Sequence, residues 1–396
     1  MKKIVYISDY ALDEYNSVRD ILYNIITLNN LQKYEHVVVK STGNMHKPIS
    51  KKIYDGFTVY SNTKLKTSDY IKAKNISLGC KISYIFHRII KRISVINKNS
   101  RYKKYDNEAF LKRIIKEEKP QLIIFLTYSP KRTYVKMCQK YKTPYIFMLY
   151  DTYIERPGID RAQAYETEKY VIDNSERYFI PSFFYEQYAK TYSGMKIAHY
   201  NLPLLINKSD VEKAFKEYNE QYNFTYFGQI QSFRKEGEIK RILRNLNIQL
   251  DVFSTENYKD DDVFKIHAAK TGHELYKKVA GSKYLVAFDN GYPYQNYLPS
   301  KVYLYTSFTK PVIAFGDNKE SALIEFFKNY PMFYYQNINE STDGLVEFLK
   351  KEKTDRFAED CYALFSEYLP EQALQTLTDS IKTVLNKQIE PIDNHI

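Results

Sequence analysis

The stretch NYLPSKVYLYTSFTKPVIAF, residues 296–315, contains the local signals that decide the fold of this chain. Pro299 favours the first turn of a helix, because its missing N–H would find no helical acceptor there. Lys310-Pro311 ends that helix and leads into an apolar strand. Another apolar strand, KYLVAF at residues 283–288, precedes the stretch. A helix that joins two buried strands predicts a parallel sheet.

Short apolar strands and amphipathic helices alternate along the whole chain, which at 396 residues suits two domains. A polar stretch at residues 206–222 divides the pattern. We therefore expect an α/β fold with two Rossmann-like, doubly wound domains facing across a cleft. The N-terminal domain is predicted at residues 1–205. A linker follows at 206–222, and a C-terminal domain that ends in helices follows at 223–396.

Composition excludes several classes of protein. Only 12 residues are Gly, and neither GxGxxG nor the P-loop pattern occurs, which argues against the usual dinucleotide and P-loop sites. The three cysteines lie far apart without a CxxC, so neither a disulfide framework nor a zinc site is expected. The apolar run in MKKIVYISDY is too short for a signal peptide, and LIIFL is too short to span a bilayer. We expect a cytoplasmic protein that is soluble or bound at a membrane surface.

The basic charge is concentrated in one segment. The formal net charge is +12, and residues 64–104 hold twelve Lys or Arg and one acid, so the rest is nearly neutral. Within it, apolar residues recur at helical spacing over 82–97, with Arg88, Lys91 and Arg92 on the other face. A basic amphipathic helix is typical of contact with an anionic membrane surface. A core-facing helix with a solvated basic side stays open, and no nucleic-acid partner is expected.

The helix predicted after Pro299 also predicts an anion site. Ser300 and Lys301 fall in its first turn, where unpaired backbone N–H groups and the helix dipole attract negative charge. Lys301 adds a point charge suited to phosphate. Because the helix follows a buried strand, its first turn is expected at the carboxyl edge of the sheet, where ligands bind.

From Pro299 to Ile313 the sequence resembles the donor-domain motif of GT-B glycosyltransferases, especially glycosyltransferase family 4 and its relatives. In that family a Pro-Ser-Lys-type helix start leads to Lys-Pro-Val-Ile, as it does here. The family's helix carries a Glu that binds the donor's ribose, and Leu304 takes its place. Asn296 stands where the family has an earlier acidic residue, and Thr309 replaces a Gly. The resemblance implies that Asn296 or Tyr303 contacts the sugar or ribose.

A second match lies in FTYFGQIQSFRKEGEIKRIL, residues 224–243, which resembles the opening strand of the family's donor domain. Gly228 ends the strand, and Lys235 is the basic residue before the helix. Gln229 replaces the Arg that often follows the Gly, so Arg234 is its expected substitute. The resemblance implies that Arg234 and Lys235 neutralise a diphosphate leaving group. A solvated basic pair is the alternative.

In the N-terminal half, YIFMLYD at residues 145–151 resembles the strand before the family's His-Asp, with Tyr150 in place of the His. Asp151 remains, and it suits a general base for an acceptor hydroxyl. A role as a loop or helix cap is equally open. Asp9 and Glu14, after the first strand, are weaker candidates.

Two other patterns bear on metal or donor binding. KDDDVF, residues 259–264, contains a DxD of the kind that holds a divalent ion in GT-A transferases. It follows a polar loop rather than an apolar strand, so a solvated turn is favoured. His267 and His273 are most simply ordinary residues, although either could line a donor pocket.

The predicted function is a metal-independent glycosyltransferase of hexosyltransferase type. It moves a sugar from a nucleotide-sugar donor, its co-substrate, to a glycan or lipid-linked glycan acceptor, and needs no further cofactor. The resemblance implies surface polysaccharide biosynthesis, such as capsule or O-antigen, at the cytoplasmic membrane face. The alternative is a non-catalytic nucleotide-sugar-binding or scaffold protein, which Leu304 favours. Asp151 is the predicted catalytic residue, and the predicted donor-binding residues are Gly228, Arg234, Lys235, Asn296, Ser300, Lys301 and Tyr303.

Overall fold

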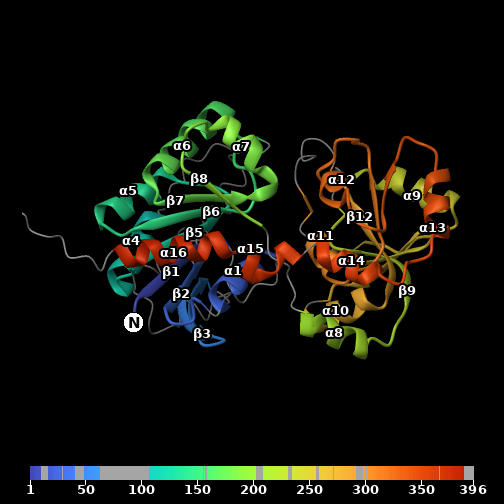
Figure 1. The fold of residues 1–396 in the computed structure, drawn as a ribbon, viewed down its shortest axis with the longest axis horizontal. Coiled ribbons are helices and arrows are strands. Elements are labelled where there is room, and N and C mark those ends of the chain that lie inside the picture. The colour runs from blue at the N-terminus through green and yellow to red at the C-terminus, as the bar shows by residue number, and fades with distance from the viewer. Residues whose placement is uncertain are drawn as a thin grey trace, which may run out of the picture. The chain divides into compact units, whose positions relative to one another are not determined.

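The computed structural model describes residues 1–396 except 10–16, 29, 41–48, 63–106, 155, 157, 202–207, 231–233, 256–257, 271, 291–297, 300, 365 and 388–396. The predicted basic segment with Arg88, Lys91 and Arg92 therefore lies outside the described residues, as do Glu14, Asn296 and Ser300. The chain forms two compact units (Figure 1). Unit 1 comprises residues 1–155, 159–200 and 375–396, and unit 2 comprises residues 156–158 and 201–374.

Unit 1 is built on an eight-stranded sheet in the order β3-β4-β2-β1-β5-β6-β7-β8. All neighbouring strands pair in parallel except β3 and β4, which form an antiparallel hairpin. The central strands are apolar and buried along their whole length, as expected for a sheet covered on both faces. The strands are β1 (Lys3–Ser8), β2 (Glu35–Lys40), β3 (Ile49–Tyr54), β4 (Phe57–Asn62), β5 (Leu122–Thr127), β6 (Tyr145–Leu149), β7 (Arg177–Pro181) and β8 (Ile197–Tyr200).

Helices cover both faces of this sheet (Figure 1). They are α1 (Ser17–Thr27), α4 (Asn107–Glu118), α5 (Arg132–Lys140), α6 (Arg161–Asn174), η1 (Ser182–Phe184), α7 (Tyr185–Thr191) and α16 (Gln375–Lys387). The last of them departs from the predicted boundary, which assigned residues 223–396 to the second domain. Helix α16 instead contacts β5 and β8 and buries Leu377, Ile381 and Leu385 in unit 1. Its amphipathic pattern predicts a helix but does not identify the sheet that the apolar face covers.

Unit 2 has a six-stranded, fully parallel sheet in the order β11-β10-β9-β12-β13-β14. Counted from β9 this is the 3-2-1-4-5-6 order of a Rossmann fold, and the order reverses between β9 and β12. Ligands of such sheets bind beyond the carboxyl ends of the strands at this switch point. The strands are β9 (Tyr222–Phe227), β10 (Leu250–Ser254), β11 (Phe264–Ala268), β12 (Ser282–Phe288), β13 (Val312–Gly316) and β14 (Phe333–Asn337).

The helices of unit 2 pack around one core of aromatic and aliphatic side chains. They are α8 (Lys208–Glu217), α9 (Glu236–Asn245), α10 (Gly272–Ala280), α11 (Lys301–Ser307), α12 (Ala322–Phe327), α13 (Asp343–Lys350), α14 (Phe357–Leu364), η3 (Ser366–Tyr368) and α15 (Pro370–Ala373). The helix between two buried strands that the sequence predicts is α11, which connects β12 to β13. Within the described part of the chain, no helix is long and apolar enough to cross a membrane.

Candidate functional site

The switch point of unit 2 brings Gly228 and Lys301 together. Gly228 follows β9 with a φ of +132°, and its amide donates to the carbonyl of Phe253 at 2.9 Å. A Cβ atom built on Gly228 would lie 2.7 Å from Nζ of Lys301, the first residue of α11. A φ of +132° favours glycine, and the missing side chain leaves room for the ammonium group. The prediction that the two residues share one site is therefore consistent with their geometry.

Lys301 is held against Tyr226, a residue of β9. Its Nζ donates to the Tyr226 hydroxyl at 2.6 Å and lies 4.0 Å from the centre of the ring. Burial and the nearby Arg234 guanidinium hold the pKa of Lys301 well below its usual range. The described residues provide no carboxylate within ion-pair distance of this ammonium group. A bound anion would therefore stabilise its positive charge.

Arg234 reaches the same hydroxyl from the loop before α9. Its Nη1 donates to the Tyr226 hydroxyl at 2.5 Å and to the carbonyl of Gln229 at 2.9 Å. Its Nε and Nη2 donate to Oδ1 of Asn290 at 3.2 and 3.0 Å. Two cationic side chains from distant parts of the sequence thus converge on one hydroxyl oxygen. A phosphate, which offers several anionic oxygens, is well suited to accept hydrogen bonds from both.

Polar side chains at the carboxyl end of β12 hold Asn290, which accepts from Arg234. Asp289 is buried, its Oδ1 accepts from the amide of Asn290 at 2.8 Å, and its Oδ2 accepts from the Tyr335 hydroxyl at 2.9 Å. Burial raises the pKa of the Asp289 carboxyl. Tyr226, Asp289 and Asn290 were not predicted from the sequence. Asp289 and Asn290 could have been predicted, because they lie directly after a buried strand.

Two other predicted donor-binding residues differ in their surroundings. Lys235 is exposed at the N-terminus of α9 with a φ of +56°, and its side chain forms no hydrogen bond with the residues that the structure describes. Tyr303 is only 4% exposed, and its ring centre lies 5.1 Å from that of Phe326 and 6.3 Å from that of Tyr368. The structure therefore corrects the assignment of Tyr303 to the donor site. Its aromatic ring belongs to the core because nearly all of the short helix α11 is buried.

In unit 1, the segment after β6 holds Asp151 in a constrained turn. The Tyr200 hydroxyl donates to the carbonyl of Leu149 at 2.7 Å, just before Asp151. The amide of Tyr153 donates to the Tyr188 hydroxyl at 2.9 Å, just after it. Asp151 itself is partly exposed at the carboxyl edge of the sheet. A carboxylate that is accessible but held on a fixed backbone suits a general base.

Asp9, the weaker candidate, has a structural function at the switch point of unit 1. Its Oδ2 accepts from the Thr127 hydroxyl at 3.0 Å and from the Tyr128 amide at 2.8 Å. The side chain is buried and ties the end of β1 to the end of β5. These contacts favour the interpretation of Asp9 as a support for the strand ends.

The three aspartates of KDDDVF form the solvated turn that the sequence predicts. Asp261 accepts from the amides of Val263 and Phe264 and pairs with Lys240 at 2.7 Å. Asp262 pairs with Arg244, and Asp260 accepts from a strand amide. Asp260 and Asp261 accept from backbone amides at and near the start of β11, and each of the three carboxylates has a different partner.

The two histidines considered for the donor pocket are each paired with an acid. Nε2 of His267 lies 2.7 Å from Oδ1 of Asp251, and Nε2 of His273 lies 2.7 Å from Oε2 of Glu217. The described residues contain no group of three or more His, Cys, Asp or Glu that could hold a metal ion.

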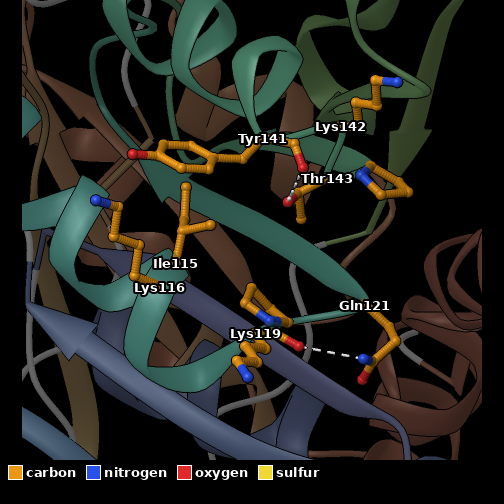
Figure 2. A pocket seen from close by; sticks show the side chains of 9 residues that line it. Ile115, Lys116, Lys119, Gln121, Tyr141, Lys142 and Thr143 are labelled. Carbon is orange, nitrogen blue, oxygen red and sulfur yellow. Dashed lines mark hydrogen bonds between the residues drawn. The ribbon is translucent and has the colours of Figure 1, made fainter.

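A cavity of about 510 Å³ lies in unit 1, at the edge of the sheet opposite the switch point of that unit (Figure 2). It is formed by the chain segments that lead from α4 into β5 and from α5 into β6, at the amino edge of the sheet. Lys116, Lys119 and Lys142 line it together with Tyr141 and Gln121. Lysines just beyond helix C-termini are expected from the helix dipole. No residue predicted for the site lines this cavity.

Comparisons with known proteins agree with this architecture. No family model and no curated protein sequence matches the chain. The trehalose 6-phosphate synthase of Burkholderia multivorans matches with a TM-score of 0.63 at 10% identity, covering 98% of this chain and 100% of that chain. A glycosyltransferase of Rickettsia africae gives a TM-score of 0.58 at 10% identity, with coverages of 97% and 98%.

HepE of Anabaena in complex with UDP-glucose gives a TM-score of 0.60 at 9% identity, covering 97% of this chain and 100% of that chain. Matches of this length, together with the two Rossmann-like sheets, show that the chain has the GT-B fold. They support that fold as a class and do not single out glycosyltransferase family 4.

Proposed function

We propose that this chain is a glycosyltransferase that moves a sugar from a nucleotide-sugar donor to a glycan or lipid-linked glycan acceptor. The observation that carries the proposal is the convergence of Lys301 and Arg234 on the Tyr226 hydroxyl at 2.6 and 2.5 Å. Sugar transfer expels a nucleoside diphosphate, and fixed positive groups stabilise the charge that develops on it. In this assignment Lys301 and Arg234 bind the donor diphosphate.

A uridine diphosphate sugar is the donor class that we propose to test first. HepE, which shares the fold, was solved with UDP, with UDP-glucose, and with UDP and glucose. The support for uridine comes from that similarity, whereas the support for a diphosphate comes from the two cations of this chain. The sugar is proposed to be a hexose, and transfer is proposed to need no metal ion.

Asp151 is proposed as the general base. In this assignment its carboxylate takes the proton from the acceptor hydroxyl as that oxygen attacks the anomeric carbon of the donor. The fixed backbone on both sides of Asp151 supports the assignment, because proton transfer requires a group held within about 0.5 Å of its productive position.

The second candidate function is a non-catalytic protein that binds a nucleotide-sugar. Leu304 favours it, because this residue stands in place of the Glu that the resemblance assigns to ribose binding. Leu304 is only 6% exposed and belongs to the core of unit 2. Release of UDP from UDP-glucose in the presence of acceptor separates the two functions, since a binding protein retains affinity for UDP without turnover.

Surface polysaccharide biosynthesis at the cytoplasmic face of the membrane is the pathway that we propose. It rests on the sequence resemblance and on the basic segment at residues 64–104, with its net charge of +11. Such a segment would hold the enzyme near a lipid-linked acceptor by attraction to anionic headgroups.

The decisive experiment is a thermal-shift panel with UDP, GDP, ADP, CMP and TDP, each with magnesium and with EDTA. A ligand at 100 times its Kd adds about 2.7 kcal/mol of stability, which raises Tm by several degrees. A shift with one diphosphate that EDTA leaves unchanged is expected. No shift with any of the five nucleotides would contradict the donor-site assignment and with it both candidate functions.

A further inference from the structure

A buried carboxylate without a cationic partner lies in the core of unit 1. Glu168 of α6 is fully buried, and none of the described Lys or Arg residues forms an ion pair with it. Three tyrosine hydroxyls donate to it instead: those of Tyr178 at 2.5 Å, Tyr188 at 2.9 Å and Tyr192 at 2.6 Å. Burying a carboxyl group is costly unless it is hydrogen-bonded, and these three donors offset part of that cost.

The three tyrosines differ in what else they contact. Tyr188 uses its hydroxyl proton for Oε1 of Glu168, which leaves its oxygen lone pairs available as acceptors. That oxygen accepts the amide N–H of Tyr153 at 2.9 Å. The hydroxyls of Tyr178 and Tyr192 form no hydrogen bond with the described residues between β6 and α6. Tyr188 alone of the three therefore connects Glu168 to the segment that carries Asp151.

The other end of that segment is held independently of Glu168. The Tyr200 hydroxyl donates to the carbonyl of Leu149 at 2.7 Å, and the Tyr150 hydroxyl lies 3.3 Å from the Ser8 hydroxyl. Asp151 thus sits between a fixed carbonyl on one side and a fixed amide on the other. The hydrogen bond of the Tyr153 amide depends on the orientation of the Tyr188 hydroxyl. Without Glu168 as its acceptor, this hydroxyl could rotate and donate its proton to another group.

We propose that Glu168 and Tyr188 are positioning residues for Asp151. Glu168 fixes the direction of the Tyr188 proton, Tyr188 then accepts from the Tyr153 amide, and this contact sets the backbone from which the Asp151 carboxylate is presented. The inference rests on the proposed function, in which Asp151 is the general base. A buried cluster on α6, β7 and α7 would thereby control a group at the carboxyl edge of the sheet.

The test compares Tyr188→Phe with Tyr178→Phe. Each substitution removes one buried hydroxyl from the same oxygen of Glu168, but only Tyr188→Phe also removes the acceptor of the Tyr153 amide. Four quantities are measured in the full chain: Tm, kcat and KM for UDP release from UDP-glucose, and hydrogen exchange of the amides at residues 150–153.

Both variants are expected to lower Tm to a similar extent. Tyr188→Phe is expected to lower kcat at least tenfold more than Tyr178→Phe, with KM for the donor nearly unchanged, and to speed exchange at Tyr153. Glu168→Gln, which keeps one acceptor oxygen, is expected to fall between wild type and Tyr188→Phe in kcat. Equal losses of kcat in the two tyrosine variants would overturn the inference, since a purely structural cluster predicts that result.

Failure of the proposed function is recognised separately. If the wild-type chain releases no UDP, or if Asp151→Asn keeps full kcat, the assignment of Asp151 as a base fails. Hydrogen exchange still decides the structural link: faster exchange at residues 150–153 in Tyr188→Phe than in Tyr178→Phe supports it. Equal exchange in the two variants overturns it.

Discussion

Lys301 and Arg234 donate to the same oxygen, the hydroxyl of Tyr226, at 2.6 and 2.5 Å. Like charges repel, and this arrangement is stabilised because the hydroxyl oxygen accepts from both side chains, while the Asn290 side chain and the Gln229 carbonyl accept from Arg234. An anion at this point would accept from both cations at once and relieve their repulsion. The pair thus defines where a diphosphate should bind, and it makes the donor assignment open to direct tests.

Lys301→Ala is expected to weaken UDP binding by tenfold or more. A hydrogen bond to a charged group contributes about 1.5–3 kcal/mol, and about 1.4 kcal/mol corresponds to tenfold in Kd. Isothermal titration calorimetry with UDP measures the change. Lys235→Ala is the matched control, because that lysine is exposed and forms no side-chain hydrogen bond with the described residues. Equal losses for the two variants would show that Lys301 has no special function in the site.

UDP binding is expected to be coupled to proton uptake. The pKa of Lys301 lies well below its usual range in the free protein, through burial and the nearby Arg234. A bound diphosphate favours the charged ammonium and raises that pKa again. Between the two pKa values binding takes up a proton, so the affinity falls as pH rises through this window. Titrations in two buffers of different ionisation enthalpy reveal the proton, and Lys301→Ala should abolish the difference between buffers.

The pH dependence of stability should reveal Glu168. Burial raises its pKa to about 7. A carboxyl with a raised pKa stabilises the folded state while it stays protonated, and this stability is lost as pH rises from its unfolded pKa through about 7. The loss amounts to roughly 3 kcal/mol, at about 1.4 kcal/mol for each pKa unit.

Urea unfolding at pH 5 and pH 8 measures this effect as a difference in the free energy of unfolding. Glu168→Gln is expected to remove most of the difference. Glu166→Gln, in the same helix but exposed, serves as the control and should leave it unchanged. An unaltered pH dependence in Glu168→Gln would mean that the carboxyl does not titrate in this range.

The sequence predicted the strands of both sheets except β3 and β8, which carry weak patterns at the edge of unit 1. Lys301 was predicted from a local signal, the helix start after Pro299, whereas Gly228 and Arg234 were predicted from the resemblance to the donor-domain motif. All three lie at or near an end of a strand or helix, and a parallel sheet brings such ends together.

The residues that were missed depend on tertiary contacts. From its position in an apolar strand, Tyr226 is expected to be a core aromatic residue. The neighbouring sequence does not show that its hydroxyl accepts from two cationic side chains. Glu168 lies in a polar stretch of α6 and reads as a solvated acid, because its three tyrosine partners come from later in the chain. Tyr303 was misassigned because a helix buried on nearly all sides has no amphipathic pattern that would show which residues face the ligand.

Chelation of metal ions is expected to leave UDP binding intact. The carboxylates of Asp261 and Asp262 are occupied by backbone amides, Lys240 and Arg244, which leaves them poorly placed for a shared ion. Asp261→Asn should lower Tm by loosening the turn before β11, while Kd for UDP with EDTA stays within about twofold of wild type. A large loss of affinity in EDTA, or in Asp261→Asn at a fixed magnesium concentration, would instead favour a metal-dependent donor site.

The basic segment predicts binding to anionic membranes. Lys91 and Arg92 lie on the polar face of the helix predicted at residues 82–97, which is outside the described part of the structure. Each basic residue near an anionic surface contributes about 1 kcal/mol. Reversing both charges changes the local charge by four units, so Lys91→Glu with Arg92→Glu is expected to weaken vesicle binding by more than tenfold.

Co-sedimentation with vesicles of phosphatidylglycerol and phosphatidylcholine measures this binding at low and at high salt. Lys350→Glu with Lys351→Glu is the matched control, because it makes the same change in net charge at an exposed site of unit 2. If the two double variants lose binding equally, the attraction comes from net charge and not from an amphipathic surface helix. Full binding of the Lys91 and Arg92 variant would exclude the segment as the membrane contact. Loss confined to that variant, and reduced by salt in the wild type, is the expected result.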